Sequence, residues 1–80
     1  MHELGILRQV VRTVVRIAEE RRIRSVAHIT LEVGMESGCV PAYLEKLFPL
    51  AVDSVPLLKD AQLRIEMVPG RVFLVKEIGY

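Results

Sequence analysis

The amino-acid sequence predicts an α+β fold in which two helices pack on one face of a three-stranded mixed sheet. Apolar residues recur with helical spacing in two segments of the chain, and they alternate with a period of two in three others. These segments follow one another in the order α-β-α-β-β, which implies a mixed sheet with both helices on the same face. At 80 residues the chain is long enough for one domain, and we expect residues 1–80 to form it.

The first helix is predicted from Leu4 to Arg22. Its apolar side consists of Leu4, Leu7, Val10, Val11, Val14, Ile17 and Ala18. On the opposite side, Arg8, Arg12 and Arg16 recur every four residues. We interpret this arginine row as a solvated face, and an anion-binding patch is the alternative.

The first strand is predicted from Ser25 to Val33, where polar and apolar residues alternate. The residues expected to face the core are Ala27, Ile29, Leu31 and Val33. His28 and Glu32 share the other face, but four strand residues separate them by roughly 13 Å, which is too far to hold one ion. We therefore interpret His28 as a surface histidine.

The second helix is predicted to begin at Pro41, after a loop that spans Gly34 to Val40. Its core-facing residues are expected to be Leu44, Leu47, Phe48 and Ala51. Pro49 lies within this helix, and a proline there removes a hydrogen bond and clashes with the preceding turn. The sequence thus predicts a kink at Pro49 or a break into two short helices.

Two further strands are predicted, one around Leu63 to Met67 and one from Arg71 to Ile78. Because only Val68–Arg71 with a Pro-Gly turn connects them, we expect them to form an antiparallel hairpin. Periodicity leaves two alternatives for the last strand, with either Phe73 and Val75 or Val72 and Leu74 facing the core.

The last strand is also expected to be an edge strand. Its free edge could pair with a second copy and form a homodimer, or Lys76 and Glu77 could block such pairing.

Composition and charge exclude several classes of partner. The chain is 51% hydrophobic and 26% charged, as globular proteins are, and its formal net charge of +1 gives no general attraction to nucleic acid or to an anionic membrane. The sequence has no apolar run near the roughly 18 residues of a membrane span, and its start lacks the apolar region of a signal peptide. We therefore expect a cytoplasmic protein.

Cys39 is the only cysteine, which rules out an internal disulfide and a zinc site of the Cys-x-x-Cys type. Its thiol could bind a soft metal or become oxidised, but a lone loop cysteine is more often incidental. The sequence contains no Ser-His-Asp, Cys-His, phosphate-binding glycine or paired-carboxylate arrangement. We expect that the protein is not an enzyme.

The strongest candidate site is the start of the chain, Met1-His2-Glu3. The amine of Met1, the backbone nitrogen of His2 and its imidazole Nδ1 can close two adjacent chelate rings around one ion, and three coplanar nitrogens suit square-planar Ni(II) or Cu(II). Glu3 could supply either its carboxylate or its backbone nitrogen as the fourth ligand. Alternatively, His2 is a solvated terminal residue and Glu3 only places negative charge in the first helical turn.

Several segments together resemble the hydrogenase and urease nickel-incorporation proteins of the HypA type. The matching features are Met-His-Glu-Leu at the start, Leu31-Glu32-Val33-Gly34, Ser37-Gly38 followed by Pro41 and Leu44, and Ala61-x-Leu63-x-Ile65. The resemblance implies a nickel metallochaperone that binds Ni(II) at His2 and Glu3. It also implies two partners, a GTPase of the HypB type and the large subunit of a nickel-iron hydrogenase.

The sequence departs from this family in two places. The family carries a zinc domain with two Cys-x-x-Cys pairs, and here the corresponding place holds only Val68-Pro69-Gly70-Arg71, so we expect no structural zinc. Some relatives have an acidic residue before the proline of the second helix, near the nickel site, where this chain has Val40. Because the zinc domain is missing, the competing hypothesis is an interaction domain that docks on a partner without delivering metal.

Overall fold

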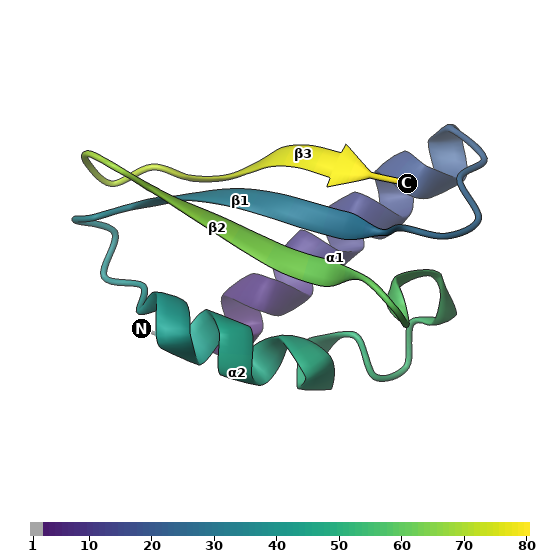
Figure 1. The fold of residues 1–80 in the computed structure, drawn as a ribbon, viewed down its shortest axis with the longest axis horizontal. Helices are drawn as coiled ribbons and strands as arrows, with labels where there is room; N and C mark the ends of the chain where they lie inside the picture. Colours follow the sequence, from purple (N-terminus) through teal and green to yellow (C-terminus); the bar gives the residue numbers. More distant parts are fainter. Residues whose placement is uncertain (1–2) are drawn as a thin grey trace.

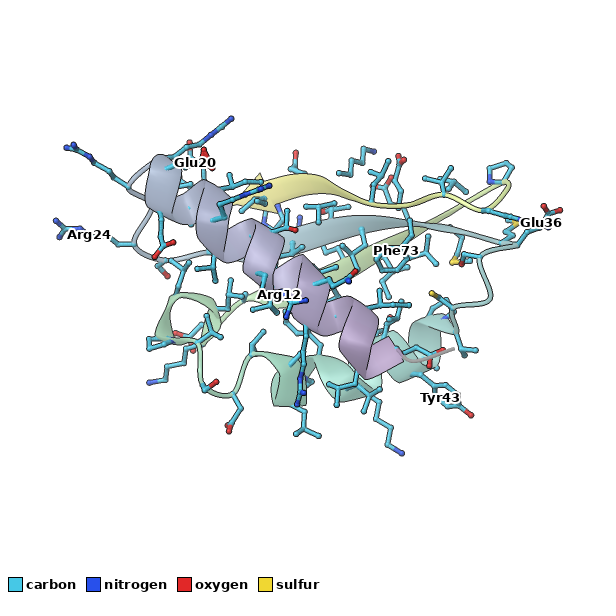
Figure 2. The ribbon with its side chains drawn as sticks, turned by 180° about the vertical axis from the view of Figure 1, so that it is seen from behind. Arg12, Glu20, Arg24, Glu36, Tyr43 and Phe73 are labelled. Atoms are coloured by element: carbon cyan, nitrogen blue, oxygen red, sulfur yellow. The ribbon has the colours of Figure 1, made fainter. Side chains whose placement is uncertain are left out.

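A computed structural model describes residues 3–80 and shows two helices packed on one face of a three-stranded sheet (Figures 1 and 2). The elements are α1 (Glu3–Glu20), β1 (His28–Gly34), α2 (Pro41–Ala51), the short 3-10 helix η1 (Pro56–Leu58), β2 (Gln62–Val68) and β3 (Phe73–Gly79). The strand order is β2-β1-β3, with β1 parallel to β2 and antiparallel to β3. The predicted fold class and element order are confirmed.

The core lies between the helices and the sheet. Its largest fully buried side chains are Leu7, Val14, Val26, Ile29, Leu31, Val33, Leu44 and Leu58. Burial of this apolar surface supplies most of the stabilisation that holds α1, because its many valines give it a modest intrinsic helix propensity. Neither helix described between residues 3 and 80 combines the length and the apolarity that crossing a membrane requires.

Helix α1 begins and ends within two residues of the predicted bounds. The predicted apolar side is turned inward, with Leu7 and Val14 fully buried and Leu4 and Ile17 partly buried. The arginine row is exposed, and Arg16 Nε lies 3.9 Å from Glu20 Oε1 one turn later. The exposure of this row is as predicted, and Arg16 is paired with Glu20 within the helix.

Strand β1 begins at His28, three residues later than predicted. Ile29, Leu31 and Val33 face the core as expected, but the two residues before the strand are reversed: Val26 is buried and Ala27 is exposed. The reason is that the Val26 N–H donates to the Leu57 carbonyl, on the segment that carries η1. The chain therefore follows a different course there, and the alternation of β1 does not extend back to Val26.

Helix α2 runs without interruption through Pro49, so the predicted break is wrong. Pro49 is exposed and lies two residues before the last helical residue, Ala51. The backbone carbonyl that loses its partner is that of Glu45, which is also exposed and can bond to water. The core-facing side of α2 is as predicted, with Leu44, Phe48 and Ala51 buried.

The predicted hairpin between the last two strands is also wrong. Strand β1 lies between β2 and β3, so these two consecutive strands do not pair with each other. Their short connection crosses the end of β1 and bonds to it. The three hydrogen bonds run from the N–H of Gly34 to the Val72 carbonyl, from Met35 to Val68 and from Glu36 to Gly70. The backbone groups of the connection are thus satisfied by the end of β1 and not by a turn of its own.

Strand β3 resolves the alternative that periodicity left open. Phe73 and Val75 face the core, and Val72 and Leu74 are exposed. The register shifts by one residue between Thr30 and Leu31, because Thr30 pairs with Glu77 and Leu31 with Val75. This bulge adds one residue to β3 and keeps Ile78 on the core side, opposite Ile29.

Candidate metal centre

The predicted metal ligands are Met1, His2 and Glu3, of which Met1 and His2 lie outside the described residues. Glu3 is the first residue of α1 and is buried, with 8% of its surface exposed. Among residues 3–80, no three His, Cys, Asp or Glu side chains come together as a metal-binding group.

The carboxylate of Glu3 accepts a hydrogen bond at the N-terminus of α2. The Val40 N–H donates to Glu3 Oε2 at 3.4 Å, and Val40 is the residue immediately before the first helical residue of α2, Pro41. The side chain of Val40 has no oxygen and cannot cap α2. The carboxylate of Glu3 instead supplies an acceptor at the N-terminus of this helix. Figure 2 shows the first turns of α1 and α2 side by side, near Tyr43.

This arrangement places one negative charge between two helix N-termini. Each N-terminus carries a partial positive charge of about half a unit, which disfavours a bare cation. The carboxylate of Glu3 offsets that charge from within the first turn of α1 and beside the start of α2. A metal ion bound here would therefore experience less repulsion from the two helix N-termini, because the negative charge of Glu3 offsets their partial positive charge.

Glu3 offers two kinds of ligand atom. Its side chain has two oxygens, and only Oε2 is needed for the hydrogen bond from Val40, so Oε1 retains the capacity to bind a metal. Its backbone nitrogen belongs to the first turn of α1, where the N–H groups have no acceptor within the helix. Both alternatives from the sequence, the carboxylate and the backbone nitrogen, are chemically compatible with this geometry.

Val40 lies directly beside the candidate site, as the hydrogen bond to Glu3 shows. Val40 is 42% exposed, and its side chain has no oxygen that could bind a metal. An acidic residue at this position would add a carboxylate next to Glu3. Position 40 is thus adjacent to Glu3, one of the predicted ligands.

Of the other two residues that were considered as ligands, Cys39 precedes Val40 but packs in the core, and His28 lies at the first residue of β1. Cys39 is buried with 9% exposure, packs in the hydrophobic core, and its N–H donates to Ser37 Oγ. His28 begins β1, whereas Gly34 ends it and leads toward Val40, so His28 lies at the end of the strand away from Val40, about 20 Å from Gly34.

His28 has a role in the sheet instead. Its Nε2 lies 3.2 Å from Glu77 Oε1, and its ring covers Gly79, where a Cβ atom would overlap it. The interpretation of His28 as a surface histidine holds in part, because its bond to Glu77 is at the surface while its own side chain is 19% exposed.

Comparison with known proteins gives a consistent family match. Residues 1–73 match the family model described as "HypA: Hydrogenase/urease nickel incorporation, metallochaperone, hypA". The chain is 36% identical over all 80 residues to a hydrogenase maturation factor HypA of Methanosarcina barkeri, and 42% identical over 71 residues to that of Geobacter metallireducens. These alignments cover 100% and 89% of this chain but 58% and 61% of the relatives, so the chain spans about three fifths of their length.

A solved structure shares the fold. The solution structure of the Ni metallochaperone HypA from Helicobacter pylori matches 85% of this chain and 58% of its own, with a TM-score of 0.79 and 18% sequence identity. At this identity the similarity supports the arrangement of helices and strands.

Proposed function

Because the chain belongs to the HypA family of hydrogenase/urease nickel-incorporation metallochaperones, we propose that it binds Ni(II) at its first residues and passes the ion to a nickel enzyme. The ligands would be the amine of Met1, the backbone nitrogen and imidazole of His2, and Glu3 through its carboxylate or backbone nitrogen. The observation that carries this proposal is the position of the Glu3 carboxylate, which the Val40 N–H holds at the start of the chain.

This geometry is suited to transient binding. A carboxylate fixed between two helix ends costs little to order, because its position is already set in the folded protein. The remaining ligands would come from consecutive residues of one chain end, so a recipient could replace them one at a time. Binding and release of the ion would then need no rearrangement of the core.

Nickel titration of the untagged protein tests this proposal. We expect the wild type to bind one Ni(II) ion and to show the absorption band of a square-planar complex, whereas His2→Ala should lose both. The matched control is His28→Ala, which removes the other histidine at the far end of β1 and should retain wild-type affinity. Equal affinities of the wild type and His2→Ala would contradict the proposal.

We further propose that the chain works without structural zinc. In place of the family's zinc domain it has the short connection that crosses β1, and its single cysteine is buried in the core. Metal analysis of the purified protein tests this: zinc should be absent while the protein remains folded. Stoichiometric zinc in protein that unfolds when a chelator is added would contradict it.

The proposed partners are a GTPase of the HypB type and the large subunit of a nickel-iron hydrogenase or a urease, in the cytoplasm. The exposed side chains of Val40 (42%) and Tyr43 (55%) lie near Glu3 and offer an apolar contact for a protein that exchanges the metal. Binding assays with the purified GTPase should show weaker binding for Tyr43→Ala than for Leu50→Ala, an exposed position near the other end of α2.

A second candidate function is an adaptor domain that docks on these partners without carrying metal. The hydrogen bond between Glu3 and Val40 favours the adaptor, because it gives Glu3 a structural role that does not depend on nickel. Partner binding without a nickel absorption band would support the adaptor. Neither function requires catalysis, and we propose that the protein is not an enzyme.

A further inference from the structure

The positive charge of the chain is concentrated on α1 and on the turn that follows it. Residues 8–24 contain six arginines and two glutamates, whereas the rest of the chain has five basic and eight acidic side chains. The net charge of +1 therefore conceals one strongly basic region. The six arginines of this region are all exposed, and they are Arg8, Arg12, Arg16, Arg21, Arg22 and Arg24.

Three of these arginines lie within four residues at the end of α1. Arg21, Arg22 and Arg24 extend from the turn that follows the helix, and Figure 2 shows Arg24 directed away from the body of the protein. Among residues 3–80, no salt bridge or side-chain hydrogen bond engages their guanidinium groups. The guanidinium groups of this turn are thus available to an anion from outside the chain.

The backbone fixes the turn in one conformation. Arg22 has a φ of 56°, in the left-handed region. Its N–H donates to the Glu19 carbonyl and the Ile23 N–H donates to the Ala18 carbonyl, which together form a Schellman motif. Glycine usually occupies the left-handed position of this motif because it has no Cβ. An arginine there costs stability, and departures from such local rules are expected mainly at functional sites.

The turn surrounds an open hollow. The hollow has a volume of about 570 Å³, and its lining includes the three arginines of the turn together with Ser25 and Tyr80. Arg21 and Tyr80 also line a neighbouring groove between α1 and β3, in which apolar side chains alternate with polar ones such as Gln9 and Thr13. The surface therefore offers charged, aromatic and mixed contacts along a path, which suits an extended chain better than an isolated ion.

The charges around the turn favour single carboxylates over phosphate. A guanidinium group binds a carboxylate through two parallel hydrogen bonds. The C-terminus of α1 carries about half a negative charge, and Glu19 and Glu20 directly precede the turn. Both oppose a phosphate group, which carries up to about two charges, more than carboxylates spread along a peptide. Nucleic acid would in addition meet the acidic remainder of the chain.

We propose that the arginine turn, residues 21–25, docks an acidic peptide segment of a partner protein, with carboxylates bound by Arg21, Arg22 and Arg24. Charge complementarity selects this occupant, and arginine and tyrosine are the residue types that contribute most at protein interfaces. Helix α1 has 18 residues, so the arginine turn lies about 27 Å from Glu3 at the other end of the helix. A protein docked here leaves the start of the chain accessible.

This inference goes beyond metal delivery and is tested on metal-free protein, so it can fail without affecting the nickel site. Fluorescence anisotropy with a labelled peptide of six glutamates should show saturable binding to the wild type. Arg21→Gln/Arg22→Gln/Arg24→Gln should weaken this binding by about tenfold or more. A wild type that does not bind the peptide overturns the proposal.

A matched variant separates the arginine turn from net charge. Arg8→Gln/Arg12→Gln/Arg71→Gln removes three other exposed arginines and changes the net charge by the same amount. Its affinity for the peptide should stay within about twofold of the wild type, because only distant charges are lost. An equal loss of affinity in both triple variants overturns the proposal, since binding would then depend on net charge alone.

A single substitution separates binding from folding. Arg22→Gly removes one guanidinium group and relieves the left-handed backbone, so it should raise the melting temperature and weaken peptide binding by about threefold. Because the variant is expected to be more stable than the wild type, unfolding cannot account for its weaker binding. Wild-type affinity in Arg22→Gly would contradict the proposed role of this residue.

Competition identifies the chemistry of the occupant. Inorganic phosphate should displace the peptide no better than sodium chloride at the same ionic strength. Single-stranded oligothymidylate of equal charge and vesicles of phosphatidylserine should bind more weakly than the peptide. Specific displacement by phosphate, or tighter binding of the DNA or the vesicles, overturns an acidic peptide as the occupant.

Discussion

A methyl group on Gly34 would overlap the carbonyl oxygen of Gly70. Gly34 ends β1, and Gly70 lies in the connection that crosses this end on its way from β2 to β3. The same methyl group would lie 2.7 Å from the Val72 backbone nitrogen, and both neighbours are backbone atoms that cannot rotate away. The close approach lets the short connection pass over the end of β1, where a side chain at position 34 would be in the way.

The first prediction concerns this contact. Gly34→Ala should lower the free energy of unfolding by about 1–3 kcal/mol, because the connection must move and its hydrogen bonds to β1 must lengthen. Urea denaturation followed by circular dichroism measures the change. Gly70→Ala is the control: it meets no neighbour, and only its left-handed backbone (φ of 88°) opposes the change, at about 1 kcal/mol. A Gly34→Ala protein as stable as Gly70→Ala would argue against the close contact.

The second prediction separates the structural role of Glu3 from its proposed role as a ligand. Glu3→Gln retains an oxygen that can accept the Val40 N–H, so its stability should stay close to that of the wild type. Glu3→Ala removes the acceptor and should cost about 1 kcal/mol. If the carboxylate binds nickel, both variants should lose affinity equally. If the backbone nitrogen is the ligand, both should retain most of it.

The third prediction adds a ligand atom beside the site. Val40→Glu keeps the backbone N–H that Glu3 accepts and places a carboxylate next to it, which should destabilise the metal-free protein slightly through like-charge repulsion. Nickel would relieve this repulsion, and its affinity should rise by roughly threefold to tenfold. Isothermal titration measures the affinity, and Leu50→Glu controls for the added charge. An equal gain for both variants would mean that only net charge matters.

The sequence was sufficient to predict most of the fold, because burial gives each element its period. The alternation of Ile29, Leu31 and Val33 and the apolar side of α1 follow directly from the core they form. The neighbours of each strand did not follow, since periodicity shows which face is buried and not which strand lies alongside. The predicted hairpin is wrong for this reason. The connection between β2 and β3 crosses the end of β1, where the Gly34 N–H donates to the Val72 carbonyl.

The surroundings of the candidate site were harder to predict from the sequence. The start of the chain suggested a chelate, but the partner of Glu3 is a backbone N–H that lies 37 residues further along the chain, and any residue except proline could supply it. The bulge at Lys76 is similar, because it follows from pairing with β1 and leaves no composition signal in β3. Only the resemblance to a family drew attention to position 40.

The fourth prediction concerns pH. Hydrogen bonding and ion pairing with Glu66 raise the pKa of Lys76 above its ordinary value of 10.5. Because the folded-state pKa is raised, the stabilisation by this pair is fully present below the unfolded-state pKa and is lost as the pH rises through the folded-state value. NMR titration of the Lys76 side chain should show its pKa falling toward 10.5 in Glu66→Gln. The wild type and this variant should converge in stability above the folded-state pKa of Lys76. An unchanged pKa in Glu66→Gln would exclude the pair with Glu66 as the cause of the raised pKa.

The fifth prediction concerns the proline within α2. Pro49 leaves the Glu45 carbonyl without an intrahelical donor, and Pro49→Ala restores the donor in a helix that already continues to Ala51. The helical gain of up to about 3 kcal/mol is reduced by fraying near the helix end and by the greater freedom of alanine in the unfolded chain, about 0.4–1 kcal/mol. We expect a net stabilisation of roughly 1 kcal/mol in urea denaturation. Leu50→Ala, the adjacent exposed position, serves as control, and a loss of stability in Pro49→Ala would show that the ring of Pro49 makes packing contacts that outweigh the restored bond.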